Sequence, residues 1–220
     1  MIKGNSPSSS PQVGQAAACI YVIDDDRSVR DALSSLFRSV GYKVQLFEST
    51  GEFMQAKRID ANSCLVLDIR LPGVSGLDLQ SHLNREQILI PIIFMTGHGD
   101  IPMSVRAMKA GAIDFLAKPF RDQDMLDAVA AALESDRKRR EADQSVAAVR
   151  SAFETLTPRE REIMTFVTSG LMNKQVAGKL GLSEITVKIH RANVMKKMAC
   201  QSLADLVRMA GLLGLNSPKV

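Results

Sequence analysis

Five polar residues that could act together on a phosphoryl group stand at or near the ends of short apolar runs, namely Asp24, Asp25, Asp68, Thr96 and Lys118. Clustered carboxylates and a backbone carbonyl form the oxygen cage that Mg²⁺ prefers. A lysine ammonium and a threonine hydroxyl can neutralise the oxygens of a phosphoryl group that reaches an aspartate. Because parallel strands end at one edge of a sheet, these residue types predict a phosphoryl-accepting site around Asp68.

The apolar runs predict parallel strands at residues 20–23, 64–67, 91–95 and 113–116, with an alternating strand at 43–47. Helical spacing of apolar residues predicts helices that begin at Arg27, at Ser49 or Thr50, at Ser75, near Ile101 and at Asp122. The second of these helices is expected to extend through Arg58. Five consecutive strand–helix units are typical of an α/β fold with a five-stranded, doubly wound parallel sheet.

The composition is that of an ordinary globular protein. The 220 residues suit two small domains, 45% of them are hydrophobic and 24% are charged. No apolar run approaches the roughly 20 residues that span a bilayer. Residues 1–18 are rich in Ser, Pro and Gln, and we expect a disordered tail there without the apolar core of a signal peptide. The sequence therefore predicts a cytoplasmic protein with no membrane partner.

Charge divides the chain into two halves. Residues 1–136 hold 13 basic and 17 acidic residues, a net charge of −4, whereas residues 137–220 hold 15 and 7, a net charge of +8. A basic half of this kind often meets a polyanion, although solvated helix faces would give the same balance. The charge alone leaves both interpretations open, so the sequence of the basic half has to decide.

The basic half has the pattern of a helix-turn-helix. The motif Thr157-Pro158-Arg159-Glu160 is a capping box with proline in the first turn, and further helices are expected from Asn173, after Ser183 and after Ser202. A short helix, a glycine-containing turn and a longer serine-capped helix form this motif. The outward face of the longer helix carries Lys188, His190, Arg191, Ala192, Asn193, Lys196 and Lys197. Such a basic, hydrogen-bonding face predicts contact with the DNA major groove.

Residues 19–135 resemble the receiver domain of two-component response regulators, whose fold is CheY-like. The resemblance rests on Asp24-Asp25, Asp68, Thr96 and Lys118-Pro119, and residues 96–103 and 108–112 resemble the FixJ branch. It implies that Asp68 is the phosphoacceptor, that Asp25 binds Mg²⁺ directly and Asp24 through water, and that the carbonyl of Arg70 is a further ligand. It also implies that Thr96 senses the phosphoryl group, that Lys118 pairs with it, and that Phe115 is an aromatic switch.

Residues 153–213 closely resemble the LuxR/NarL/FixJ-type DNA-binding domain. The resemblance implies that Lys188, Ile189 and Ala192 face base edges, while Thr186, His190, Lys196 and Lys197 mainly hold phosphates. Ala192 stands where some relatives carry a long polar residue. Because alanine cannot hydrogen-bond, that base is read through a thymine methyl, by Arg191 or Asn193 instead, or not at all.

Together these resemblances predict four segments: a tail at 1–18, a receiver at 19–135, a helical linker at 136–152 and a LuxR-type helix-turn-helix domain at 153–220. The linker is charged and has weak apolar periodicity, so both a coiled coil and a solvated spacer fit it. Its basic run at 137–140 could also touch phosphates. The three cysteines are far apart in the sequence and are expected to be reduced bystanders.

The expected function is that of a phosphorylation-activated transcriptional activator. The resemblance implies a sensor histidine kinase as phosphodonor, a homodimer on phosphorylation, a two-fold repeat in DNA as target, and RNA polymerase as a further partner. The protein is not expected to be a metabolic enzyme, apart from slow autodephosphorylation. Two alternatives are a constitutive dimeric DNA-binding regulator with a non-switching receiver, and an aspartyl-phosphate phosphatase. Such phosphatases usually place a second aspartate where this chain has Arg70, which disfavours the second alternative.

Overall fold

The computed structural model describes residues 18–97 and 101–215. Its backbone separates into two compact units, residues 1–139 and 140–220. The division falls inside one continuous helix, α5, which runs from Asp122 to Glu154. The tail expected at residues 1–18 lies outside the described residues, except for Ala18. None of the helices in the described ranges has the length and apolarity to cross a bilayer.

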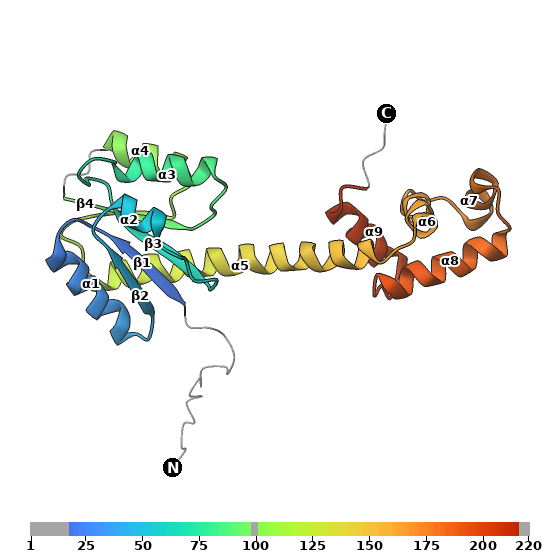
Figure 1. The fold of residues 1–220 in the computed structure, drawn as a ribbon, viewed down its shortest axis with the longest axis horizontal. Helices are drawn as coiled ribbons and strands as arrows, with labels where there is room; N and C mark the ends of the chain where they lie inside the picture. Colours follow the sequence, from blue (N-terminus) through green and yellow to red (C-terminus); the bar gives the residue numbers. More distant parts are fainter. Residues whose placement is uncertain (1–17, 98–100, 216–220) are drawn as a thin grey trace, which may run out of the picture. The chain divides into compact units, whose positions relative to one another are not determined.

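The first unit is a five-stranded parallel sheet with helices on both faces, as the sequence predicted (Figure 1). Its elements up to α5 are β1 (Cys19–Ile23), α1 (Arg27–Ser39), β2 (Lys43–Phe47), α2 (Thr50–Gln55), β3 (Ser63–Asp68), α3 (Gly76–Arg85), β4 (Ile92–Thr96), α4 (Ile101–Lys109) and β5 (Asp114–Ala117). The strand order is β2-β1-β3-β4-β5. The chain therefore reverses its direction of winding between β1 and β3, and ligands bind at such a switch point in open α/β sheets.

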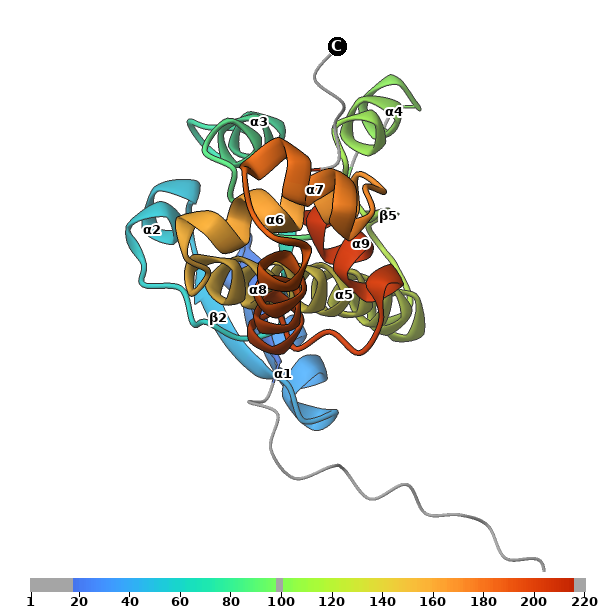
Figure 2. The same cartoon turned by 90° about the vertical axis from the view of Figure 1, so that its right-hand side faces the viewer.

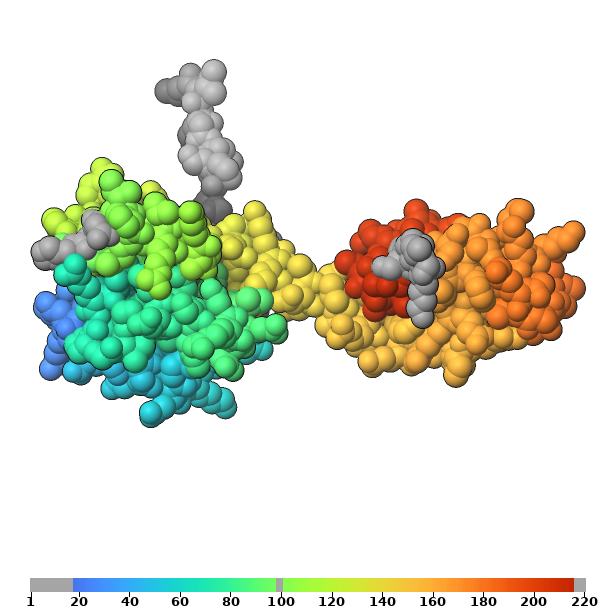
Figure 3. All heavy atoms as spheres, turned by 90° about the horizontal axis from the view of Figure 1, so that it is seen from above, coloured from blue at the N-terminus to red at the C-terminus, as the bar shows by residue number. Residues whose placement is uncertain are grey.

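Two apolar clusters cover the two faces of this sheet. On one face, Leu33 and Phe37 of α1 pack with Met125 and Val129 of α5, and all four side chains are buried. On the other face the sheet is covered by α2, α3 and α4. Figure 2 shows α1 on one side of the sheet and α2, α3 and α4 on the other, and the spheres of Figure 3 show α3 beside α4. With both faces covered, the central strands β1, β3 and β4 are buried and largely apolar, which explains their continuous apolar runs, whereas the edge strand β2 alternates.

Local signals decide where most helices begin. Asp26 caps α1 by accepting a hydrogen bond from Ser28 N–H, and Ser75 caps α3 in the same way through Asp78 N–H. The expected extension of the second helix to Arg58 is wrong, since α2 ends at Gln55. Ala56 there adopts an extended backbone with ψ 142°, which ends the helical conformation before Lys57 and Arg58.

The helix α5 is tied to the amino end of β3. The carboxylate of Asp136 is 1% exposed, and its Oδ2 atom accepts a 3.0 Å hydrogen bond from the backbone N–H of Ser63. Its other oxygen accepts from the guanidinium of Arg139. Ser63 is the first residue of β3 and Asp68 is the last. The strand that carries the expected acceptor is thus anchored to α5 at its opposite end.

The second unit contains the four helices α6 (Pro158–Thr168), α7 (Asn173–Leu180), α8 (Glu184–Lys197) and α9 (Leu203–Leu212). The predicted capping box at Thr157 and the predicted serine caps at Ser183 and Ser202 are confirmed. Gly181 ends α7 in the left-handed conformation, with φ 64°, and so turns the chain into α8. Ile163, Val176, Val187, Val194 and Leu206 form the centre of the core. The predicted helix-turn-helix is therefore present.

Candidate functional site

The carboxyl ends of β1 and β3 bring three carboxylates together. Asp24 is fully buried, Asp68 is 7% exposed and Asp25 is exposed to solvent. One carboxylate oxygen from each lies within 4.8 Å of the other two. Hard oxygen donors at this spacing, with one of them open to solvent, suit a hard cation such as Mg²⁺ that keeps several waters. The donor set therefore fits the expected metal.

Lys118 joins two of these carboxylates. Its Nζ atom lies 2.6 Å from Oδ2 of Asp24 and 2.6 Å from Oδ2 of Asp68. Lys118 follows β5, and its backbone N–H donates a 2.7 Å hydrogen bond to the carbonyl of Thr96 at the end of β4. The peptide bond between Lys118 and Pro119 is cis. Residues from β1, β3 and the loop after β5 thus converge on one ammonium group.

The electrostatics of this cluster favour a charged lysine. Burial lowers the pKa of Lys118, but the hydrogen bonds that its ammonium donates to Asp24 and Asp68 outweigh burial, so the pKa lies above its usual value. Burial also raises the pKa of Asp24, and it outweighs the opposing hydrogen bonds from Lys118 and from Asp26 N–H. Three carboxylates thus lie around a single ammonium group, so the cluster can accept a further cation.

Backbone groups fix the orientation of both buried carboxylates. Oδ1 of Asp68 accepts a 2.9 Å hydrogen bond from Arg70 N–H, and Oδ1 of Asp24 accepts one of 2.9 Å from Asp26 N–H. Behind β3, α3 begins at Gly76, where a Cβ atom would lie 2.5 Å from the backbone oxygen of Asp68. The absence of a side chain at residue 76 therefore allows the helix to approach the end of β3.

Thr96 and Phe115 occupy neighbouring strands near this edge. Thr96 ends β4, is fully buried, and pairs in register with Ala117, the residue before Lys118. Phe115 pairs with Phe94, is half-buried, and packs against the apolar cluster beneath α2, α3 and α4. The structure thus places Thr96 at the same sheet edge as the carboxylates, and Phe115 farther down β5. Residues 98–100 of the FixJ-like motif lie outside the described residues.

Arg30 is a residue of this site that the sequence analysis did not identify. It lies in α1, where its Nη1 atom donates hydrogen bonds of 2.7 Å to the carbonyl of Asp24 and 3.0 Å to the carbonyl of Asp25. Its side chain is only 12% exposed. From the sequence alone, an arginine on a helix of mixed polarity is expected to be a surface residue. The sequence signal that could have indicated a role in the site is the position of Arg30, one helical turn after the acidic residues 24–26.

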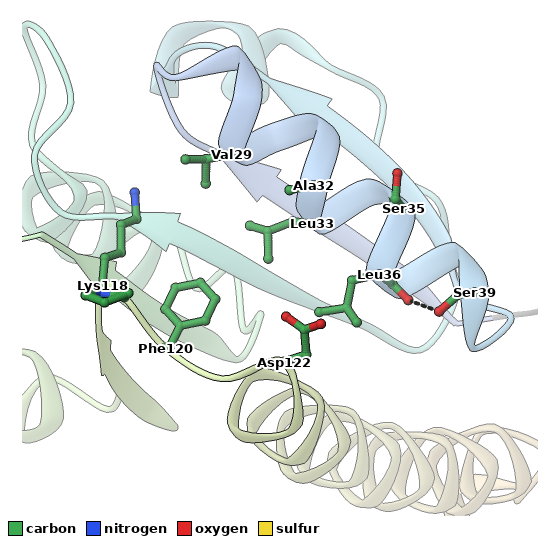
Figure 4. Close-up of a pocket in the computed structure, with 10 residues that line it drawn as sticks. Val29, Ala32, Leu33, Ser35, Leu36, Ser39, Lys118, Phe120 and Asp122 are labelled. Atoms are coloured by element: carbon green, nitrogen blue, oxygen red, sulfur yellow. Dashed lines mark hydrogen bonds between the residues drawn. The ribbon is translucent and has the colours of Figure 1, made fainter.

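A groove of about 590 Å³ opens beside Lys118. Figure 4 shows Val29, Leu33 and Leu36 of α1 on one side and Phe120 on the other, with Asp122 at the start of α5. The walls are mainly apolar, and the lysine that contacts Asp68 lines one end. The groove thus connects the carboxylate cluster with an accessible apolar surface on α1.

The expected DNA-contacting residues lie on α8, and most of them are accessible. Lys188, Ile189, Ala192, Asn193 and Lys196 are exposed, whereas Thr186, His190 and Arg191 are half-buried. Ile189 is 57% exposed, so a large apolar side chain stands on the accessible surface of α8. An exposed isoleucine beside an exposed lysine suits a surface that meets both thymine methyl groups and hydrogen-bonding base edges.

Three of the predicted DNA contacts have partners within the protein. The hydroxyl of Thr186 hydrogen-bonds to Ser183 at 2.8 Å, as part of the helix cap. The guanidinium of Arg191 donates to Oδ1 of Asn173 on α7, and Lys197 forms an ion pair with Glu160 on α6. Arg191 and Lys197 therefore fix α8 against α7 and α6, a role that the sequence analysis did not assign to them.

Comparisons with known proteins cover both units. The family described as "Response regulator receiver domain" matches residues 20–130, and "Bacterial regulatory proteins, luxR family" matches residues 154–210. Nodulation protein W of Bradyrhizobium diazoefficiens is 62% identical over 200 residues, which cover 91% of this chain and 88% of that protein. Response regulator protein TodT of Pseudomonas putida is 47% identical over 193 residues, with 88% and 85% covered.

Solved structures of response regulators are also similar to most of this chain. The low-resolution structure of response regulator StyR matches with a TM-score of 0.80 and 47% identity, and covers 89% of this chain and 99% of that one. Full-length FixJ from B. japonicum matches with a TM-score of 0.55 and 38% identity, and covers 93% and 100%.

Proposed function

We propose that Asp68 is the phosphoryl acceptor of this chain, which belongs to the response regulators that join a receiver domain to a LuxR-type DNA-binding domain. These response regulators are phosphorylation-dependent transcription regulators. The observation that supports this proposal is the contact of Asp68 with Lys118, beside two further carboxylates at the switch point of the sheet. One oxygen of Asp68 attacks the phosphorus as the bond to the donor breaks. The product is an acyl phosphate on Asp68.

The carboxylates of Asp24, Asp25 and Asp68 and the carbonyl of Arg70 would hold Mg²⁺. When bound, Mg²⁺ neutralises charge on the transferring phosphoryl oxygens. Lys118 already contacts Asp68, so its ammonium needs little movement to meet a phosphoryl oxygen. Arg70 N–H holds Oδ1 of Asp68 and thus orients the attacking carboxylate.

The proposed switch uses residues at the neighbouring strand ends. A phosphoryl group on Asp68 adds negative charge and acceptor oxygens, which recruit the hydroxyl of Thr96. Movement of Thr96 draws Phe115 inward and changes the surface formed by α4 and β5. We propose that this surface dimerises, so that two copies of α8 bind a two-fold repeat in DNA.

The proposed segments keep the boundaries expected from the sequence: receiver at 19–135, linker at 136–152 and DNA-binding domain at 153–220. A sensor histidine kinase is the proposed phosphodonor, and RNA polymerase is a further proposed partner of an activator. Slow loss of the phosphoryl group from Asp68 to water would be the extent of any catalysis. Because the DNA target lies in the cytoplasm of a bacterium, we place the protein there.

The proposal is tested by measuring DNA binding and oligomeric state together, with and without an acyl-phosphate donor and Mg²⁺. The native chain is compared with Asp68→Asn and with Asp31→Asn, which makes the same chemical change at an exposed position of α1. We expect the donor to cause dimerisation and tighter DNA binding in the native chain and in Asp31→Asn alone. Equal binding in every condition would favour a constitutive regulator, and sustained turnover of phosphate would favour a phosphatase.

A further inference from the structure

Arg30 holds the loop that carries the first two carboxylates of the site. Its guanidinium bonds to the backbone carbonyls of two consecutive residues, Asp24 and Asp25, from the first turns of α1. The Nη2 atom of the same group lies 3.8 Å from Oε2 of Glu48 in the loop after β2. One side chain thus connects the loop after β1 with the loop after β2.

The chemistry of arginine suits this contact. A guanidinium presents several N–H donors in a fixed plane, so it can hold two carbonyl oxygens in one geometry. The Arg30 side chain is 12% exposed, which reduces competition from water for these hydrogen bonds. Hydrogen bonds to a charged donor are stronger than those between neutral groups. The carbonyl contacts leave the carboxylate groups of both aspartates available for other partners.

We propose that Arg30 is a positioning residue that sets the Asp24–Asp25 loop for binding of a divalent cation. This inference rests on the proposed function, because it concerns the same carboxylate cluster. Without the guanidinium, the backbone of the two aspartates loses a fixed point, and the carboxylates have to be ordered when the cation binds. That ordering weakens binding, as it does when outer partners of metal ligands are removed in other sites.

Simple electrostatics predicts the opposite effect. Arg30 is a cation close to a site that binds a cation, so removal of its charge should strengthen Mg²⁺ binding if charge were its only contribution. Positioning predicts weaker binding in the same variant. The sign of the change therefore separates the two roles.

The decisive measurement is calorimetric titration of Mg²⁺ into the full chain and its Arg30→Gln and Arg30→Lys variants. Arg27→Gln is the matched control, because Arg27 lies on the same helix, is 86% exposed and pairs with Asp31. We expect Arg30→Gln to raise the Kd for Mg²⁺ about 10-fold. Arg30→Lys keeps the charge without the planar fork and should raise it less, whereas Arg27→Gln should leave it unchanged or slightly lower.

A kinetic readout separates positioning from general damage. With an acyl-phosphate donor, the Mg²⁺ concentration that gives half the maximal rate should rise in Arg30→Gln, while the rate at saturating Mg²⁺ stays close to that of the native chain. Urea unfolding checks that each variant is folded. If Arg30→Gln does not fold, the same measurements on Arg30→Lys decide the test.

Two outcomes distinguish this inference from the proposal on which it rests. Native-like or tighter Mg²⁺ binding in folded Arg30 variants would overturn the positioning role alone. A native chain that neither binds Mg²⁺ nor accepts a phosphoryl group would overturn the proposed function.

Discussion

The Nζ atom of Lys197, the last residue of α8, lies 2.7 Å from Oε2 of Glu160 on α6. Glu160 is 3% exposed, and the same oxygen accepts a 2.8 Å hydrogen bond from the N–H of Thr157. The carboxylate that completes the capping box of α6 therefore also anchors the end of α8. Lys197 has a structural role before any DNA is present, and its expected phosphate contact stays a prediction.

Lys196 and Lys197 are adjacent, and the structure predicts different results for their removal. Lys197→Ala leaves the buried Glu160 carboxylate without its cation, and should lower the free energy of unfolding by about 1–2 kcal/mol, because the lysine itself is partly exposed. Lys196→Ala should change stability by less than about 0.5 kcal/mol. It should reduce the slope of log K for DNA against log salt concentration by about 0.9 for one lost phosphate contact. Urea unfolding and DNA titrations at several salt concentrations measure both quantities. A reduced salt slope without lost stability in Lys197→Ala would contradict this assignment.

Acid should weaken the contact between α6 and α8. Burial alone would raise the pKa of Glu160, but hydrogen bonds from Lys197 and Thr157 outweigh it and hold the pKa below its usual value of 4.5. The folded state therefore binds this proton less tightly than the unfolded state. The stabilisation is fully present above about pH 4.5 and is lost as the pH falls through the lower, folded-state pKa.

This effect is measured as the difference in the free energy of unfolding between the native protein and Glu160→Gln, at neutral and at acidic pH. The variant should be less stable by about 2 kcal/mol at pH 7. The difference should shrink below pH 4.5. Glu162→Gln is the control, because Glu162 is exposed and pairs with Arg159 at the surface. A difference that is independent of pH would show that charge on Glu160 is not its cause.

Asp136 should stabilise the first unit through its bond to β3. Asp136→Ala removes the acceptor of the buried Ser63 N–H, and we expect a loss of about 2–3 kcal/mol in the free energy of unfolding. Asp136→Asn keeps an acceptor oxygen and should lose less. Asp127→Ala, at an exposed position of α5, is the control. Faster amide exchange at Ser63 in Asp136→Ala would locate the effect, and unchanged exchange would contradict it.

Lys118 should matter for stability as well as for phosphoryl transfer. Lys118→Met leaves Asp24 and Asp68 facing each other without their shared cation, so the metal-free variant should unfold at a lower temperature than the native chain. Mg²⁺ should raise its Tm more than it raises the native Tm, because the metal replaces the lost positive charge. Lys109→Met, at an exposed lysine of α4, provides the comparison. An equal Mg²⁺ effect in both variants would speak against charge compensation by Lys118.

The meeting of Lys118 and Asp24 at one edge of the sheet could be predicted from the sequence, although 94 residues separate them, whereas their ion pair was not predicted. Both stand at or just after the carboxyl end of a strand, and parallel strands deliver such residues to one edge whatever the length of the connections. Helix caps at Thr157, Ser183 and Ser202 were predictable for a local reason, since each cap contacts its own first turn.

The pairings of Arg30, Asp136 and Lys197 could not be predicted in this way. Each lies on a helix rich in charged residues, where periodicity identifies the polar face but not the element that it meets. Asp136 stands in a run of charges that reads as solvated, yet its carboxylate is buried against Ser63. Ionic partners between helices depend on the packing of whole elements, and that information is absent from local spacing.

The close approach of α3 to β3 limits which residues the chain tolerates at Gly76. By helix propensity alone, alanine in place of glycine would favour a helix by up to about 1 kcal/mol. Here the added methyl group would meet the backbone oxygen of Asp68 at 2.5 Å. A saturation library selected for signalling should therefore retain glycine at residue 76 while neighbouring exposed positions of α3 diversify. Gly76 therefore has to be retained for the position of Asp68, although glycine itself has no reactive side chain.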